Sequence, residues 1–443
     1  MNKFIRLRLF IMMVLELFIW GCWLPMIYAY LPSLKFSAVE QSWILAAFPI
    51  AAIVGMFFSN QFADRNFAAE RFLAFSHLVG GVAIFLLAYT KAFWPFFSLM
   101  MVHCLLYVPT LSIVNSVAFA NIKDPQKEFG AIRVGGTIGW ILAAWPFTFI
   151  FVDWNQVQAA NPQGFKAWLG TVLGAGLVGD ALQAAVPWTF IVAGISSFVL
   201  AAYSLTLPHT PPKKVEAGAE RLAWLEAVKL LKHPFVLILW LVTLIDSFVL
   251  YAYFNWTGTF LGTAKSAGGV GVQGNWIMPI MSIGQVAEII TMFVLGATLK
   301  RLGWKLTMII GILGHAARFS IYAFYPETTP VVVVQLVHGI CYAFFFATVY
   351  IFVDEHFPKD VRASAQGLFN AVILGLGALL ANFICPMLLA DVFTKNKVTD
   401  FRGLFLVPLA ASVVGAIALA FFFHPPKRKE ESAGSKALSA AAH

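Results

Sequence analysis

The stretch LFIMMVLELFIWGCWLPMIYAYLP, residues 9–32, carries one charged side chain, Glu16. An α-helix needs about 20 residues to cross the hydrocarbon core of a bilayer, so this stretch is long enough to span it. Basic residues precede it, as in a secretory signal, but no small-residue cleavage site follows cleanly. We therefore predict that residues 9–32 form a first transmembrane helix.

The composition of the whole chain points the same way. Hydrophobic residues make up 60% of the 443 residues and charged residues 12%, whereas soluble domains are roughly half apolar and a quarter charged. This excludes soluble enzymes, secreted disulfide-rich domains and disordered scaffolds. The net charge of +9 fits basic cytoplasmic loops, so we expect a lipid bilayer and no nucleic acid as partner.

Continuous apolar runs recur along the chain, and a β-barrel would instead show short alternating strands. The predicted fold class is therefore an all-α polytopic membrane protein with twelve transmembrane helices. The predicted spans are residues 9–32, 41–62, 72–90, 94–120, 131–152, 187–206, 234–262, 277–299, 305–324, 330–353, 363–390 and 403–424.

Residues 153–186 could add a thirteenth span, because they include the apolar run AWLGTVLGAGLVGDALQAAV. With twelve spans, 21 of the 30 Lys and Arg residues fall on the side of the N-terminus and seven on the other side. A thirteenth span would move every loop from Lys213 onward to the opposite side and break the positive-inside rule. We therefore predict a partly helical extracellular loop at 153–186 and cytoplasmic N- and C-termini.

The chain divides at a proline- and lysine-containing stretch near its midpoint. We predict an N-terminal six-helix bundle at 1–206, a cytoplasmic linker at 207–232 and a C-terminal six-helix bundle at 233–424. The polar residues 425–443 are expected to be a disordered cytoplasmic tail.

Two charged turns occupy the same place in each half: FADRNFAAERFL (62–73) and GATLKRLGWKLTM (296–308). They resemble degenerate copies of the Gly-x-x-x-Asp-Arg-x-Gly-Arg-Lys signature of the major facilitator superfamily. The first lacks the glycines, and the second has Lys300 in place of the acidic residue. This resemblance implies two repeat halves that rock about a site near the membrane midplane.

Ionisable residues at membrane depth are costly and are therefore functional candidates. Arg133, Thr137 and Trp140 stand at i, i+4 and i+7, so one helix face offers a cation, a hydroxyl and an aromatic ring. Gln285 and Glu288, three residues apart, suit hydrogen bonding to a polar solute and proton uptake. Structural helix packing with an Arg–Glu pair is the alternative for these residues.

Other polar residues are weaker candidates. Glu16 is a second candidate for proton coupling, or a structural hydrogen-bonding group. His338 and Tyr342 stand at i, i+4, where packing or a coupling role is open. Tyr251 and Asn255 could contact a planar ligand, or serve aromatic packing in the seventh span. No nucleotide-binding loop is present, so we expect an ion gradient to drive the protein, with no cofactor and no metal.

Six local motifs make the chain similar to the nucleoside:proton symporters. The resemblance implies that Arg133, Thr137, Trp140, Gln285 and Glu288 contact a nucleoside and that Glu288 couples protons. The motifs are WGCWL (20–24), YVPTLSIVN (107–115), IRVGGTIG (132–139), TLPHTP (206–211), IMSIGQVAE (280–288) and RASAQGLF (362–369).

The chain departs from this family on two helices. Family members place Gln and Asn on the seventh helix, where this chain has Tyr251 and Phe254, with Asn255 adjacent. On the tenth helix they show a Tyr followed later by Phe-Asp, where this chain has His338 and then Tyr342–Ala343. These changes remove hydrogen-bonding groups from the C-terminal half of the expected site, so they bear on the identity of the cargo.

The predicted function is proton-coupled import of nucleosides by alternating access, by a monomer in a bacterial inner membrane. A sugar, glycoside or amino-sugar-containing solute is the alternative cargo, and a non-transporting sensor is another class. No paired carboxylates, metal-ligand cluster or Ser/His arrangement favours an enzyme. The predicted substrate-contacting residues are Arg133, Thr137, Trp140, Tyr251, Asn255, Gln285, Glu288, His338 and Tyr342.

Overall fold

The computed structural model describes residues 3–123, 125–212, 228–357, 359–396 and 398–425. Most of the predicted linker and all but the first residue of the predicted tail lie outside these ranges. The side chains of Asp64 and Arg65, in the first charged turn, also lie outside the described part.

The first half of the described chain forms long apolar helices and a group of short ones. The long helices are α1 (Lys3–Ser33), α2 (Ala38–Asn66), α3 (Ala69–Leu87), α4 (Phe93–Ala120), α5 (Pro125–Ala144) and α10 (Pro187–Ser204). The short helices are α6 (Phe147–Ile150), α7 (Trp154–Ala160), α8 (Phe165–Gly174) and α9 (Gly179–Ala185).

The second half is also helical, with several irregular turns. Its α-helices are α12 (Pro234–Gly262), α13 (Gly274–Phe324), α14 (Thr328–Val333), α15 (Val337–Cys341), α16 (Thr348–His356), α17 (Lys359–Asn370), α18 (Gly377–Met387) and α19 (Phe401–Phe422). Short 3-10 or π turns join them: η1 (Leu230–Lys232), η2 (Lys265–Ala267), η3 (Val334–Leu336), η4 (Tyr342–Ala347), η5 (Ala371–Leu376) and η6 (Leu388–Val392). A two-stranded hairpin, β1 (Thr394–Lys395) with β2 (Val398–Thr399), precedes α19.

Ten helical stretches of the described chain are long and apolar enough to cross a membrane. One of them, α13, has 51 residues, and its backbone turns at Gly303, where φ is 69° and ψ is 174°. The left-handed φ suits glycine, which has no Cβ, and the turn makes two spans of α13. The charged helix α5 supplies the remaining crossing, so the predicted all-α, twelve-span fold is confirmed.

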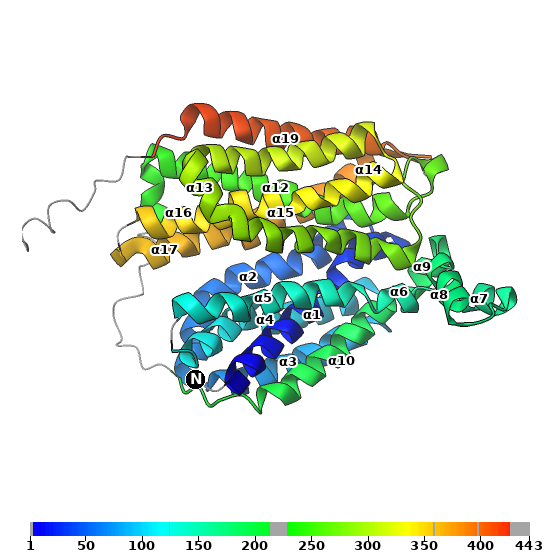
Figure 1. Cartoon of the computed structure of the whole chain (residues 1–443), viewed down its shortest axis with the longest axis horizontal. Helices are drawn as coiled ribbons and strands as arrows, with labels where there is room; N and C mark the ends of the chain where they lie inside the picture. Colours follow the sequence, from blue (N-terminus) through cyan, green and yellow to red (C-terminus); the bar gives the residue numbers. More distant parts are fainter. Residues whose placement is uncertain (1–2, 124, 213–227, 358, 397, 426–443) are drawn as a thin grey trace, which may run out of the picture.

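The helices gather in two groups that lie side by side (Figure 1). In the first group α1 packs on α5 and α10, and α3 packs on α4 and α10. In the second group α13 packs on α15 and α19, and α12 packs on α18 and α19. The groups meet where α2 contacts α18, α5 contacts α13, and α1 contacts α12. A site between the groups would therefore be lined by these helices.

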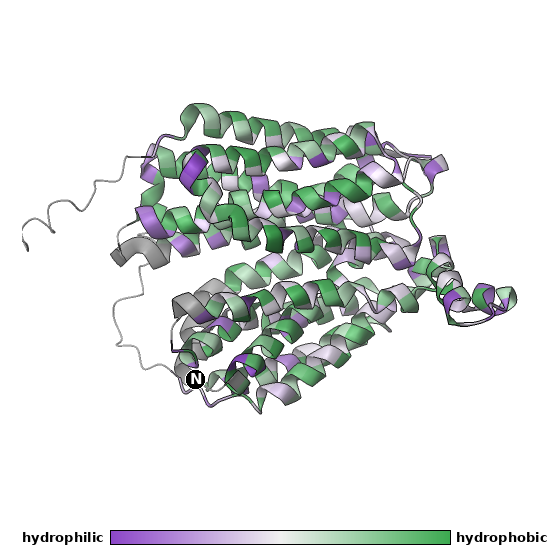
Figure 2. Ribbon diagram, viewed as in Figure 1, coloured by the Kyte–Doolittle hydropathy of each residue, from purple (hydrophilic) through white to green (hydrophobic). Residues whose placement is uncertain are grey.

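The outer surface of the helices is apolar, as a lipid-facing surface must be. Large apolar side chains such as Phe75, Phe293 and Phe421 are exposed, Phe293 to 83%. Hydropathy colouring shows apolar residues along the helices and hydrophilic ones gathered toward their ends and in the short helices (Figure 2). The four cysteines are buried and free.

The fifth span is shorter than predicted. We expected it to run to residue 152, but α5 ends at Ala144 and the short α6 begins at Phe147. Pro146 explains the break, because proline has no N–H to donate and its ring clashes with the preceding turn. Residues 153–186 contain α7, α8 and α9, which project from the end of the molecule opposite the start of α1 (Figure 1).

Candidate functional site

A cavity of about 530 Å³ lies between the two helix groups. It extends from Trp20 past Arg133 to Asn115 and Tyr350, toward the end of the molecule where α1 begins. Eight of the nine predicted substrate-contacting residues line it. They are Arg133, Thr137, Trp140, Tyr251, Gln285, Glu288, His338 and Tyr342.

Close packing of α5 on α1 determines the direction in which the cavity residues of α5 point. A Cβ at Gly135 would come within 2.7 Å of the Phe10 carbonyl oxygen, and one at Gly139 would collide with the Val14 carbonyl oxygen. The glycine face of α5 therefore lies directly on the backbone of α1. The neighbouring face of the same helix, with Arg133, then points into the cavity.

The C-terminal group contributes its residues from α13, α15 and η4. A Cβ at Gly339 of α15 would approach the Glu288 backbone nitrogen to 2.5 Å, so α15 and α13 are in backbone contact. Gln285 is buried, and Glu288 is half-buried on the cavity wall. No ion pair within 4.0 Å joins Glu288 to Arg133, although the two charges interact across the cavity. The Glu288 carboxylate is thus available for a proton or a ligand.

Aromatic rings line the wall between the two groups. The Trp140 ring lies edge-on to Trp20 at 5.1 Å and to Phe254 at 6.2 Å between centroids. Phe254 also contacts the Tyr251 ring at 6.3 Å. Such surfaces suit a flat, partly apolar ligand, because aromatic rings stack in offset or edge-to-face arrangements.

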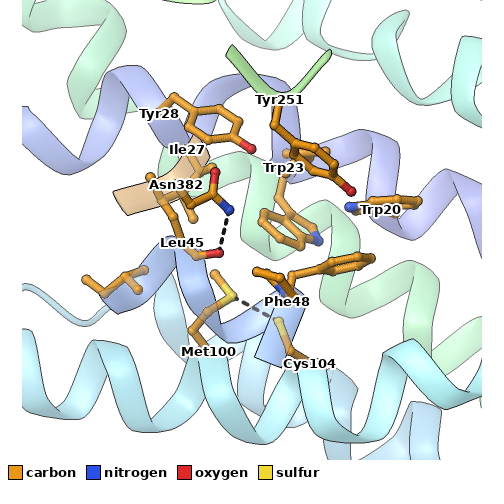
Figure 3. A pocket seen from close by; sticks show the side chains of 13 residues that line it. Trp20, Trp23, Ile27, Tyr28, Leu45, Phe48, Met100, Cys104, Tyr251 and Asn382 are labelled. Atoms are coloured by element: carbon orange, nitrogen blue, oxygen red, sulfur yellow. Dashed lines mark hydrogen bonds between the residues drawn. The ribbon is translucent and has the colours of Figure 1, made fainter. Parts of the chain in front are cut away.

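One predicted residue, Asn255, lies outside the cavity. Its Nδ2 donates to Asn382 Oδ1 at 3.0 Å, and Asn382 Nδ2 donates to the Leu45 carbonyl oxygen at 2.9 Å. These hydrogen bonds join α12 and α18 of the second helix group to α2 of the first, and Figure 3 shows the bond between Asn382 and Leu45. The structure therefore places Asn255 at a junction between the groups and not on the wall of the cavity.

Beyond Trp20 the space between the groups narrows to a recess of about 10 Å³ (Figure 3). Trp23, Tyr28 and Phe48 fill this region, together with Tyr251. Because Trp20 and Tyr251 line both the recess and the cavity, the recess is the closed end of the same passage. It lies on the side of the molecule that carries α7–α9.

Residues 173–177, at the end of α8 and just after it, are hydrogen-bonded to the start of α13 in the other helix group. Gln273 Nε2 donates to the Gly174 carbonyl oxygen at 2.9 Å, and Trp276 Nε1 donates to the Leu173 carbonyl oxygen at 2.9 Å. The Gly274 N–H donates to the Leu177 carbonyl oxygen at 2.8 Å. We call these bonds the insert latch. They tie the two groups together at the closed end.

Loss of latch bonds should favour conformations in which the groups separate at this end. Trp276→Phe keeps an aromatic ring at this position and removes one hydrogen bond, of about 1 kcal/mol, so the open population should rise about fivefold. Spin labels at Lys166 and Lys395 would report this as a longer-distance fraction. Gln163→Ala is the matched control, because among the described residues the Gln163 side chain bonds only to the Asn161 carbonyl oxygen, within the insert. Equal distance distributions for Trp276→Phe and the control would contradict the latch.

Glu16 lies away from the cavity in a sealed cluster of the N-terminal group. Its carboxylate accepts from Thr110 Oγ1 at 2.6 Å and lies 2.9 Å from His77 Nε2, and the Tyr107 hydroxyl bonds its carbonyl oxygen. Glu16 and the His77 side chain are fully buried. This position of Glu16 fits its interpretation as a structural hydrogen-bonding group.

Tyr350 lines the cavity and was not among the predicted residues. Its hydroxyl donates to Asn370 Oδ1 at 2.6 Å, and both residues lie on the wall near the wide end. The sequence does contain a signal for Tyr350: it stands about two helical turns after Tyr342 on the same span. The π turn η4 lies between these two tyrosines, so their register could not be taken from the sequence.

Comparison with known proteins shows the family of the chain. A family model described as "Nucleoside H+ symporter" matches residues 3–173 and 167–428. The putative nucleoside transporter YegT of Escherichia coli is 30% identical over 396 residues, covering 88% of this chain and 86% of that protein. The xanthosine permease of Escherichia coli is 28% identical, covering 96% and 98%.

Solved structures show the same arrangement. The crystal structure of nucleoside transporter NupG superposes with a TM-score of 0.77 at 25% identity, covering 96% of this chain and 99% of that one. A D-xylose-proton symporter, 15% identical with a TM-score of 0.66, shares the fold alone. The chain therefore belongs to the nucleoside H+ symporter family of the major facilitator superfamily, which is a family of transporters and not of enzymes.

Proposed function

We propose that the protein imports nucleosides together with protons and that both bind in the 530 Å³ cavity. One observation carries this proposal: Arg133, Thr137 and Trp140 from one helix group meet Gln285 and Glu288 from the other on the same cavity. Residues from both groups then hold one solute, so binding and the relative movement of the groups are linked.

The chemistry of the wall matches the two parts of a nucleoside. The rings of Trp140 and Phe254 suit stacking on a planar base, and the Gln285 amide beside them suits hydrogen bonding to the edge of that base. Arg133 and Glu288 suit the ribose hydroxyls, because a cation donates hydrogen bonds and a carboxylate accepts them.

Glu288 is proposed to couple the proton to this movement. An ionised carboxylate at membrane depth is costly when it loses water, so protonation favours closure of the cavity around the substrate. After release of the proton, Arg133 across the cavity balances the negative charge. The protonation state of Glu288 then determines whether the loaded carrier can change conformation.

We further propose the topology that this cycle requires. Residues 1–206 and 233–424 form the two six-helix bundles, joined by the cytoplasmic linker 207–232. With cytoplasmic termini, the insert lies outside, and the closed recess faces outward. The cavity then opens toward the cytoplasm, so the structure is in an inward-facing state. The bilayer is the bacterial inner membrane, and the protein works as a monomer, because one chain builds the whole cavity.

Uptake of labelled uridine and adenosine tests the function. Cells without their own nucleoside carriers should accumulate one or both nucleosides when they express this protein, and a protonophore should abolish the accumulation. If the protein has the family fold but does not carry these nucleosides, accumulation in expressing cells should equal that in cells with an empty vector. Absence of uptake of either nucleoside from properly inserted protein would contradict the proposal.

A further inference from the structure

A fully buried arginine lies behind the C-terminal wall of the cavity. Arg318, on the second arm of α13, has no exposed surface. Its Nη2 lies 3.1 Å from His338 Nδ1, and its guanidinium covers the Tyr253 ring at 4.3 Å. The Tyr253 hydroxyl is itself held by Gln335 at 3.0 Å. Arg318 is thus fixed against a residue that lines the cavity.

The contact with Arg318 decides which nitrogen of His338 carries the proton. A guanidinium stays protonated in proteins and can only donate. His338 Nδ1 must therefore accept, so it holds a lone pair, and the ring proton lies on Nε2. His338 consequently presents a fixed N–H donor on its other side.

The Nε2–H group of His338 faces Gln285. In the structure the Gln285 amide nitrogen, Nε2, lies 3.4 Å from His338 Nε2. Two donors cannot bond to each other, whereas an amide turned by 180° offers its oxygen to the His338 N–H. No described side chain pairs with the other end of the amide. This end of the amide is buried and, after the turn, is an NH₂ group without a partner among the described residues, on a residue that lines the cavity.

Two contacts hold the guanidinium in place, the one with His338 Nδ1 and the one over the Tyr253 ring. Asp246 of α12 is also fully buried, and its Oδ1 lies 3.8 Å from His315 Nε2. Among the described residues no hydrogen bond joins Asp246 to Arg318. The position of Arg318 and its direction of donation therefore rest on His338 and Tyr253.

We infer that Arg318 is a positioning residue: through His338 it commits Gln285 to donate a hydrogen bond to the cargo. Gln285 lines the 530 Å³ cavity together with Trp140 and Phe254, where a base would stack, so the partner of its amide is the edge of the base. The preferred cargo class is nucleosides with an oxo group at that edge, such as inosine and uridine, over the amino bases adenosine and cytidine. This inference rests on the proposed function.

The tautomer can be observed without transport. In ¹⁵N-histidine-labelled protein, the signal lost in His338→Gln identifies His338. We expect a neutral ring with Nε2 protonated and Nδ1 bare, and loss of this state in Arg318→Met. A proton on Nδ1 in the unmodified protein would overturn the inference, even if nucleoside uptake is normal.

The selectivity test uses inosine and adenosine, which differ at one edge. We expect an apparent KM roughly tenfold lower for inosine. Arg318→Met and His338→Leu should each remove this ratio, and the double variant should be no worse than either, because both act through one chain. Arg318→Lys keeps a charged donor and should retain the ratio.

The outcomes separate the two proposals. If Arg318→Met lowers uptake of both nucleosides equally and leaves the ratio of their KM values intact, Arg318 has a structural role. This outcome overturns the inference and leaves the proposed function standing. If Arg318→Met does not fold, Arg318→Lys and the tautomer measurement still decide. No uptake of any nucleoside by the unmodified protein overturns the proposed function and the selectivity with it, whereas the tautomer result is unaffected.

Discussion

Replacement of Glu288 by glutamine should abolish concentrative nucleoside uptake while exchange across the membrane continues. The amide has nearly the same size as a protonated carboxyl and carries no charge, so the variant resembles a carrier that always holds its proton. It can bind and change conformation, but it cannot take energy from the proton gradient. Internal and external nucleoside concentrations should then become equal, and a protonophore should have no further effect.

The coupling role of Glu288 also predicts how the apparent KM for uptake changes with external pH. In the unmodified protein, raising the external pH removes the proton from Glu288 before closure, so the apparent KM for uptake should rise with pH. In Glu288→Gln the KM should stay flat over the same range. The KM of the unmodified protein and that of Glu288→Gln are measured by counterflow of labelled uridine in vesicles. Glu327→Gln is the control, because Glu327 is exposed and pairs with Lys265 at 3.2 Å, away from the cavity. Accumulation by Glu288→Gln equal to that by the control would exclude Glu288 as the coupling residue.

A single methyl group at Gly139 should prevent the two cavity-forming helices of the N-terminal group from packing. A Cβ there would come within 2.9 Å of the Val14 Cα and would collide with the Val14 carbonyl oxygen. Backbone cannot move aside as a flexible side chain can, so α1 and α5 must separate. Overpacking of this kind costs about 1–3 kcal/mol or more. We expect Gly139→Ala to give little monodisperse protein and a lower Tm.

Gly130, on the same helix, provides a matched comparison. A Cβ at Gly130 meets nothing within 4 Å, and alanine is favoured over glycine in a helix by about 1 kcal/mol. Gly130→Ala should therefore fold normally, with a Tm equal to or above that of the unmodified protein. Fluorescence-detected size-exclusion chromatography and a thermal melt compare the two. A Gly139→Ala protein as stable as Gly130→Ala would show that α1 and α5 are not held in backbone contact.

Sequence reasoning recovered the parts of the fold that depend on local composition. The twelve apolar runs correspond to the observed helices, since length and hydropathy alone decide whether a segment can cross a bilayer. The charge distribution argued against a span at 153–186, and the structure has the short helices α7–α9 there. The early end of α5 was missed although Pro146 was visible, because the apolar run continues past it.

The site was predictable where one helix face carries several groups and not where tertiary packing decides. Arg133, Thr137 and Trp140 share a face by helical periodicity and do line the cavity. Asn255 and Glu16 have equally polar side chains in equally apolar spans, but their neighbours on other helices, Asn382 and His77, turn them into internal contacts. Such long-range partners leave no trace in the spacing of residues along one span.

The insert latch is asymmetric in its chemistry. On the insert every acceptor just described is a backbone carbonyl, at Leu173, Gly174 and Leu177, whereas Gln273 and Trp276 donate from side chains. Side-chain changes in the insert leave those acceptors in place as long as the backbone path is kept. Sequence variation can therefore alter the surface of the insert without removing the acceptors of the latch. Substitutions that weaken the latch are instead expected at its side-chain donors at the start of α13, Gln273, Asn275 and Trp276.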